Sequence, residues 1–192
     1  VILLIIIFTY GLYSQKESYI WYFGKNAGLD FNTSNLEPKV KFDGALANWE
    51  GCASICDKNG NLLFYTNGIT IWDKTHKIMK NSSSLKGHSS STQSGLIVRS
   101  PLNENKFNIF TTGCVENSNN DGLYYTVVEF NSLNPLGTVT SQNNFINDFN
   151  IERITAVLHK NKKNIWIICY NWKENKYYSY LLNENGIDIK NV

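Results

Sequence analysis

The chain has 192 residues, of which 42% are hydrophobic and 14% aromatic, so its size and apolar content suit one domain with a sizeable core. Lysine and arginine number 18 against 16 acidic residues, and this near balance argues against a strongly basic nucleic-acid binder and against an acidic tail. Only 3 prolines and 13 glycines exclude collagen-like and proline-rich disordered chains. Asparagine is the compositional anomaly, with 27 residues.

The chain begins with the apolar run VILLIIIF, and no residue before Lys16 is charged. A run of eight residues is far shorter than the roughly 20 that span a bilayer, so we expect no stable membrane span. It matches the hydrophobic region of a secretory signal peptide, and Leu12 and Ser14 suit a cleavage site after Ser14. We therefore expect a signal-peptide remnant at 1–14 and an exported domain at 15–192. A buried first strand is the alternative.

Short runs rich in β-branched and aromatic residues then recur between turn signals, a pattern typical of an all-β sandwich, barrel or propeller. Three sets of runs follow one another, and each spans about 40–50 residues, the length of a four-stranded propeller blade. The predicted strands are Cys52–Asp57, Leu62–Thr66, Ile69–Asp73 and His76–Met79 in the first set, Ser94–Arg99, Phe107–Thr112, Leu123–Phe130 and Gly137–Thr140 in the second, and Arg153–His159, Ile165–Tyr170, Tyr177–Leu182 and Ile187–Ile189 in the third.

Asparagine and glycine mark the turns between these runs. Asn67-Gly68 predicts a two-residue hairpin with positive φ at both positions. The segment Asp57–Asn61 places oxygen-bearing side chains at alternate positions, as a calcium loop does, but its glycine and its twelfth residue do not fit an EF-hand. We therefore interpret it as a hairpin turn, which Asn183–Gly186 repeats.

The predicted strand Ile165–Tyr170 is apolar on both faces. An antiparallel sheet with one wet face alternates polar and apolar residues, whereas a sheet packed on both sides does not. Radially packed blades cover a sheet on both sides. The sequence therefore predicts an all-β chain forming a partial β-propeller of four-stranded antiparallel blades, about three blades plus N-terminal strands, with a β-sandwich as the alternative.

Several strings along the chain together resemble the N-terminal propeller-like region of large secreted Bacteroidetes surface proteins. These strings are Ile20–Phe31 (IWYFGKNAGLDF), Asp43–Ala45, Trp49–Ala53, Asp57–Met79, Ser91–Ser94, Gly122–Tyr125 and Glu152–Val157. The resemblance covers essentially the whole chain after Ser14. Proteins of this kind end in a gliding-motility-associated, type B sorting domain for type IX secretion, which is not found in this sequence. Because the chain stops after about three blades and closed propellers have about four to eight, we expect it to be a fragment.

The resemblance implies a secreted or cell-surface module with a structural, adhesive or gliding-related role, and it carries no catalytic residues. We therefore expect a non-enzymatic interaction module without a cofactor, whose partners are other surface proteins or extracellular glycans. Surface-glycan binding is the alternative function. The best candidate for a stacking platform is Trp172, which lies in a predicted loop between Asn171 and Lys173.

The residue types of enzymes and metal sites are scattered along the chain. His76, His88 and His159 lack the spacing of metal ligands or of a catalytic triad. A propeller glycoside hydrolase would need a carboxylate pair, for which Glu50, Asp148 and Glu152 are the candidates. We expect Glu50 and Glu152 instead to accept hydrogen bonds from backbone groups.

The chain has four cysteines, which in an exported protein suggest disulfides. Cys52 and Cys56 lie four residues apart on one predicted strand, about 13 Å, which is too far for a bridge. A bridge between Cys114 and Cys169 on adjacent blades is compatible with the strand pattern.

Overall fold

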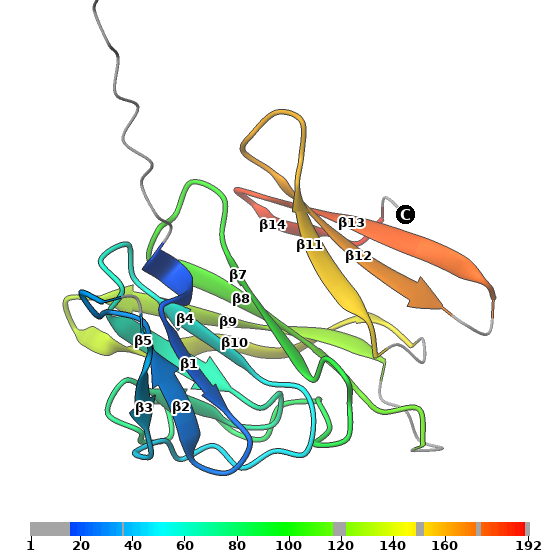
Figure 1. Ribbon diagram of the computed structural model, residues 1–192. Coiled ribbons are helices and arrows are strands. Elements are labelled where there is room, and N and C mark those ends of the chain that lie inside the picture. Colours follow the sequence, from blue (N-terminus) through cyan, green and yellow to red (C-terminus); the bar gives the residue numbers. More distant parts are fainter. Residues whose placement is uncertain (1–15, 36, 117–121, 149–151, 172–173, 191–192) are drawn as a thin grey trace, which may run out of the picture.

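The computed structural model describes residues 16–35, 37–116, 122–148, 152–171 and 174–190 (Figure 1). The predicted signal-peptide remnant, residues 1–14, lies outside this part of the chain. The predicted all-β class is confirmed, because the described residues form antiparallel strands and one three-residue 3₁₀ turn, Lys16–Ser18.

The strands make four antiparallel sheets, and in each sheet consecutive strands are neighbours. The first contains β1 (Ile20–Phe23), β2 (Ala27–Asp30) and β3 (Lys39–Lys41), and the second contains β4 (Ala53–Cys56), β5 (Leu62–Thr66) and β6 (Ile71–Asp73). The third contains β7 (Gly95–Arg99), β8 (Lys106–Thr112), β9 (Leu123–Asn131) and β10 (Asn134–Asn147). The fourth contains β11 (Ile154–Leu158), β12 (Ile165–Asn171), β13 (Lys176–Asn183) and β14 (Gly186–Asp188). Four sheets, rather than the two of a β-sandwich, therefore make up the described chain.

The predicted strands of the three sets overlap the observed ones, with three differences. The N-terminal strands form a sheet of their own, and β10 extends well beyond the predicted Gly137–Thr140. Its pairing with β9 changes register at four places, and such irregularities allow a long strand to bend. The predicted strand His76–Met79 is reduced to a single bridge between Trp72 and Ile78.

The two-residue hairpin predicted at Asn67-Gly68 is wrong. Strand β5 ends at Thr66 and β6 begins at Ile71, so the connection has four residues. Only Gly68 has a positive φ, of 81°. Oδ1 of Asn67 accepts hydrogen bonds from the backbone N–H groups of Ile69 and Thr70, at 3.0 and 2.8 Å. This side-chain bonding stabilises a wider loop than the type I′ turn.

The asparagine excess has a common structural use. Side-chain oxygens of asparagines accept hydrogen bonds from backbone N–H groups two or three residues later, in turns throughout the described chain. The asparagines that do so are Asn67, Asn103, Asn131, Asn161, Asn171 and Asn183. Four others, Asn26, Asn81, Asn143 and Asn175, have positive φ, which asparagine tolerates better than most residues.

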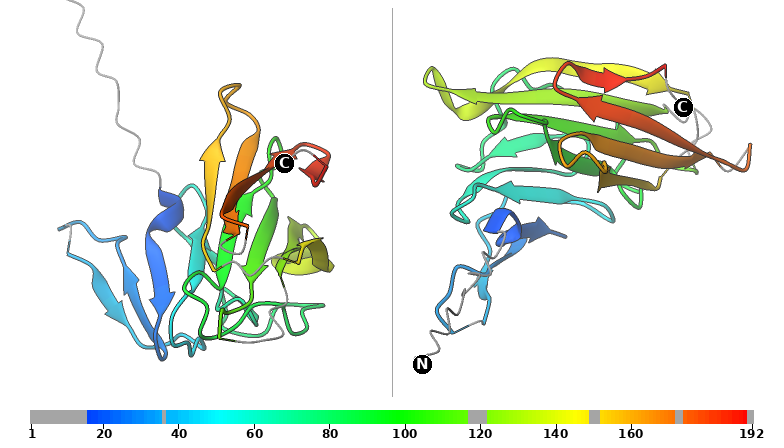
Figure 2. Two further views of the ribbon diagram at one scale, coloured as in Figure 1. Left: turned by 90° about the vertical axis from the view of Figure 1, so that its right-hand side faces the viewer. Right: turned by 90° about the horizontal axis from the view of Figure 1, so that it is seen from above.

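The sheets stack in chain order, with a hydrophobic core between each neighbouring pair (Figure 2). Tyr22 and Tyr65 pack between the first and second sheets, and Phe64 and Phe107 between the second and third. Phe110 and Ile167 pack between the third and fourth sheets. The third sheet is therefore covered on both faces, which matches its apolar sequence pattern.

The two end sheets differ from the third, because the described residues cover only one face of each. Ile167 and Cys169 of β12 lie in the core against the third sheet, whereas Trp166, Ile168 and Tyr170 alternate with them on the outer face. The first strand of each sheet contacts the first strand of the next, in the order β1, β4, β7 and β11. A hydrogen bond of 2.9 Å from the backbone N–H of Tyr22 to Oγ of Ser54 links the first two of these strands.

Candidate functional site

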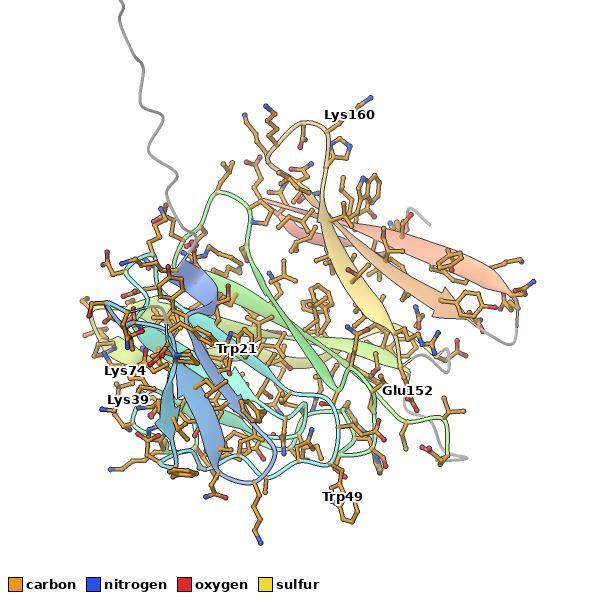
Figure 3. All side chains as sticks on the ribbon, viewed as in Figure 1. Trp21, Lys39, Trp49, Lys74, Glu152 and Lys160 are labelled. Atoms are coloured by element: carbon orange, nitrogen blue, oxygen red, sulfur yellow. The ribbon has the colours of Figure 1, made fainter. Side chains whose placement is uncertain are left out.

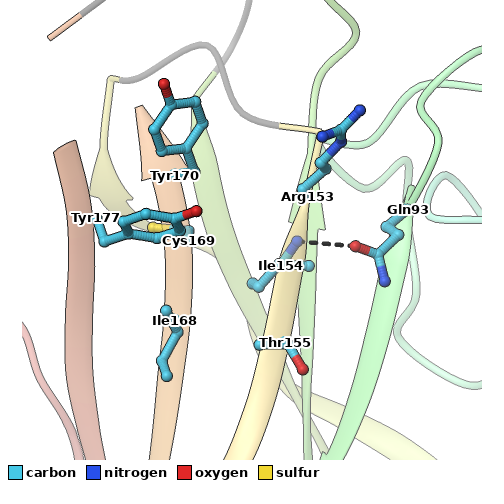
Figure 4. Close-up of a pocket in the computed structure, with 8 residues that line it drawn as sticks. All are labelled: Gln93, Arg153, Ile154, Thr155, Ile168, Cys169, Tyr170 and Tyr177. Atoms are coloured by element: carbon cyan, nitrogen blue, oxygen red, sulfur yellow. Dashed lines mark hydrogen bonds between the residues drawn. The ribbon is translucent and has the colours of Figure 1, made fainter. Parts of the chain in front are cut away.

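A pocket of about 260 Å³ lies on the fourth sheet, at the end where β11 begins (Figure 4). Tyr170 of β12 and Tyr177 of β13 are paired across the two strands, with ring centroids 5.0 Å apart at an interplanar angle of 48°. The hydroxyl of Tyr170 donates a hydrogen bond of 2.7 Å to Oδ1 of Asn175, which holds that ring in place. Tyr177 is 77% exposed. The aromatic side of the pocket therefore presents one fixed ring and one open ring.

The polar side of the pocket comes from β11 and the segment before β7. Arg153, Thr155 and Gln93 line it together with Ile168. Oε1 of Gln93 accepts a hydrogen bond of 2.9 Å from the backbone N–H of Ile154, so the amide NH₂ of Gln93 remains as a donor (Figure 4). Within the described chain, no carboxylate lies within ion-pairing distance of the Arg153 guanidinium. The pocket thus combines aromatic surface with a cation and neutral hydrogen-bonding groups.

A second cluster joins the first two sheets. The hydroxyl of Tyr22 donates to Oδ1 of Asp43 at 2.8 Å, and Lys41 lies 3.0 Å from the other oxygen of that carboxylate. Nε2 of His76 is 3.7 Å from Asp43, and Nδ1 of His76 is 3.0 Å from the hydroxyl of Tyr65. The cluster therefore brings together residues from four segments that are distant in sequence.

The ionisation of this cluster suits a structural joint better than a catalytic site. Burial and the neighbouring Asp43 carboxylate raise the pKa of Tyr22 far above its usual value, so Tyr22 remains a hydrogen-bond donor. Partial burial opposes ionisation of Asp43, but hydrogen bonds from Lys41 and Tyr22 outweigh it and lower the pKa of Asp43. Near neutral pH the protonated phenol donates a stable hydrogen bond to the ionised carboxylate and does not transfer its proton.

Glu152 is the one candidate hydrolase acid that the fold holds in a defined position. Its carboxylate accepts hydrogen bonds from the backbone N–H of Val115 and from the backbone N–H and hydroxyl of Thr92, the last at 2.8 Å. These bonds outweigh the effect of burial and lower the pKa of Glu152. The predicted bonding to backbone groups is confirmed for Glu152. Glu50 and Asp148 are exposed to solvent.

All four cysteines are free thiols, so the bridge between Cys114 and Cys169 is not formed. Burial raises the pKa of Cys169 to about 12, although a hydrogen bond with Asn147 partly offsets it, and burial raises the pKa of Cys56 to about 11. Thiols of such high pKa are poor nucleophiles and poor metal ligands. Cys52 and Cys56 lie at the first core, where they pack as small apolar side chains.

The turn reading of Asp57–Asn61 is confirmed. Oδ1 of Asp57 accepts hydrogen bonds from the backbone N–H groups of Asn59 and Asn61, at 2.8 and 2.9 Å, and Gly60 has a φ of 91°. The carboxylate that a calcium ion would need is thus bonded to its own loop. In the part of the chain that the structure describes, no three histidine, cysteine or acidic side chains are grouped to hold a metal ion.

The predicted stacking residue Trp172 lies outside the described residues. Trp49, in the segment between β3 and β4, is 88% exposed and projects into solvent (Figure 3). Sequence reasoning missed the pair of Tyr170 and Tyr177, although the hairpin that joins their strands would have placed them opposite each other. No short-range signal exists for the contact of His76 with Asp43, because the two residues are 33 positions apart and strands β4, β5 and β6 lie between them.

No protein-family model matches this chain, and the comparisons with curated proteins and with solved structures give no match. Among the residues with a described position, none belongs to a helix of the length and apolar character needed to cross a membrane.

Proposed function

We propose that the chain is a non-catalytic structural or interaction module of a secreted or cell-surface protein, and that its four sheets are blades of a β-propeller. The stacking order supports the blade arrangement, because the first strands β1, β4, β7 and β11 contact one another in sequence. In a propeller the first strand of each blade lines the central channel. The resemblance to Bacteroidetes surface proteins extends the proposal to adhesion, gliding and type IX secretion.

The observation that carries the interaction role is the apolar outer face at each end of the stack. On the first sheet, Trp21 and Val40 are 47% and 54% exposed, and on the fourth sheet Val157 is 47% exposed. Contiguous apolar surface on an exported protein marks a site for another protein or ligand. Both faces carry aliphatic and aromatic side chains, as do the faces that pack within the chain, so further protein surface is the chemistry that fits them.

The non-catalytic part of the proposal rests on how the acidic groups are used. Glu152 and Asp43 are both occupied by internal hydrogen bonds, and the pKa of each is lowered rather than raised. A general acid at neutral pH needs a raised pKa. A hydrolase would be detected by the release of reducing ends from polysaccharides, which we expect to be absent.

Self-association tests the interaction role. An apolar face that binds another protein discriminates weakly between partners, so it should also bind a second copy of this chain. Sedimentation velocity over a wide range of concentration should show association of the chain, and Val40→Lys or Val157→Lys should shift it toward monomer. The control is Leu133→Lys, at a hairpin tip where the side chain is 88% exposed. A chain that remains monomeric at every concentration would remove the support for these faces as interaction surfaces.

Surface-glycan binding is the second candidate function, and the aromatic pocket beside Arg153 favours it. Trp172 remains a predicted stacking residue for this role. Loss of binding on a glycan array after Trp172→Ala would support its participation, and unchanged binding would exclude it.

A further inference from the structure

The pocket on the fourth sheet has the chemistry of a site for a charged sugar ring. Tyr177 offers an open aromatic face, and the hydrogen bond from Tyr170 to Asn175 fixes the neighbouring ring. The C–H groups on one face of a pyranose pack well against such rings, because the aromatic face carries partial negative charge. This ring contact needs no charged side chain. The polar groups of the pocket can therefore determine which sugar binds.

Arg153 supplies that specificity. Its sequence neighbour Glu152 directs its carboxylate to Thr92 and Val115, so the guanidinium makes no direct ion pair among the described residues, although its charge helps to lower the pKa of Glu152. A guanidinium binds a carboxylate through two parallel hydrogen bonds. The amide NH₂ of Gln93 and the hydroxyl of Thr155 line the same pocket and suit sugar hydroxyls.

We infer that this pocket binds one carboxylated sugar ring of an acidic polysaccharide. The ring would lie on Tyr177, with its carboxylate on Arg153 and its hydroxyls toward Gln93 and Thr155. The volume of about 260 Å³ is slightly below the ~300–1,000 Å³ of ordinary ligand pockets, so it fits a single ring of a longer chain. This inference rests on the proposed interaction function and names a ligand for it.

Isothermal titration of the whole chain with tetragalacturonic acid tests the inference. The matched ligand is the fully methyl-esterified tetramer, which keeps the rings and removes the charges. We expect the acid to bind at least about tenfold more tightly than the ester, because bonds between charged groups are about twice as strong as neutral ones. Equal affinities, or tighter binding of the ester, would overturn the inference.

Two variants locate the site. Arg153→Gln should weaken binding of the acid about tenfold and leave binding of the ester unchanged, whereas Tyr177→Ala should weaken both ligands. Lys160→Gln is the control, since it removes a positive charge from an exposed turn of the same sheet (Figure 3). An equal loss in Lys160→Gln and Arg153→Gln would mean general electrostatic attraction and would overturn the assigned site.

The same preparations separate this inference from the proposed function. All three side chains are exposed, so unchanged thermal unfolding should show that the variants fold. The pocket shares the outer face of the fourth sheet with Val157, so the titration is made at a concentration at which sedimentation shows monomer. A monomer that does not bind the acid, in a chain that self-associates at higher concentration, would overturn the sugar site alone. Release of reducing ends from the tetramer would instead contradict the non-catalytic function.

Discussion

The hydroxyl of Tyr22 donates a hydrogen bond of 2.8 Å to Oδ1 of Asp43, and the ring of Tyr22 stacks on that of Tyr65 at a centroid distance of 4.6 Å. The hydrogen bond ties β1 to the segment between the first two sheets, and the stack ties β1 to β5. One side chain therefore joins two sheets through a polar contact and an apolar one. Gly44 accommodates the joint, since a Cβ atom there would lie 2.5 Å from the ring of Tyr22.

Removing the polar half of this joint should weaken the fold. We expect Tyr22→Phe to lower the free energy of unfolding by about 1 kcal/mol, because the hydrogen bond is lost while the ring stays. Denaturant unfolding measures the change. Tyr124→Phe is the control, since no hydrogen bond is found for its hydroxyl in the described chain. Equal effects of the two substitutions would contradict the role given to Asp43.

Stability should fall in acid. The pKa values of Asp43, Asp57 and Glu152 are lowered in the folded chain, so the unfolded chain binds more protons as the pH falls. The stability contributed by these groups is fully present above the ordinary carboxyl pKa of about 4 and is lost as the pH falls through the lowered values. Urea unfolding from pH 7 to pH 3 should show this decline. Glu152→Gln should make the decline less steep, and an unchanged slope would contradict the assignment for Glu152.

Gly68 should tolerate no side chain. Its φ is 81°, and a Cβ atom would lie 2.2 Å from the backbone oxygen of Ser94. We expect Gly68→Ala to destabilise the chain by about 3 kcal/mol, from backbone strain and overpacking together. Gly24→Ala is the matched control, because its φ is 58° and its surroundings are open. It should lose only about 1 kcal/mol, and a similar loss in both variants would mean that the contact with Ser94 yields easily.

The cysteines should react in an order set by burial. Cys56, Cys114 and Cys169 are buried, whereas Cys52 is half-buried. Burial also raises the pKa of Cys56 to about 11 and, with a partial offset from Asn147, that of Cys169 to about 12, so thiolate is scarce at pH 8. Ellman's reagent should therefore label Cys52 first in the native chain and all four thiols only after unfolding. Fewer than four thiols in the unfolded, unreduced chain would indicate a disulfide.

The strands were predictable because their signal is local. Leu62–Thr66 coincides with β5, and Ile165–Tyr170 lies within β12. The apolar character of Ile165–Tyr170 on both faces predicted packing on both sides, whereas the described residues cover only its inner face. The turn at Asp57–Asn61 was predictable for the same reason, since one side chain bonds to N–H groups within four residues. The loop after Thr66 was not predictable. The Asn67-Gly68 dipeptide indicates a two-residue turn, whereas the side chain of Asn67 accepts hydrogen bonds from backbone N–H groups and stabilises a longer loop.

The candidate sites depended on contacts that no local pattern encodes. His76 approaches Asp43 because two sheets stack, and Gln93 reaches Ile154 across a separation of 61 residues. The pair of Tyr170 and Tyr177 is partly predictable, since hairpin pairing places the two residues opposite each other once the strand ends are known.

The sequence by itself determined the all-β class, the order of the strands and the positions of most turns, because runs of β-branched and aromatic residues and the turn chemistry of Asn, Asp and Gly act over a few residues. The tertiary structure decided which faces are covered, which carboxylates accept hydrogen bonds from distant donors, and that Arg153 lines a pocket with a pair of tyrosines. These features depend on how whole sheets stack, and stacking is set by the summed burial of many side chains rather than by any one segment.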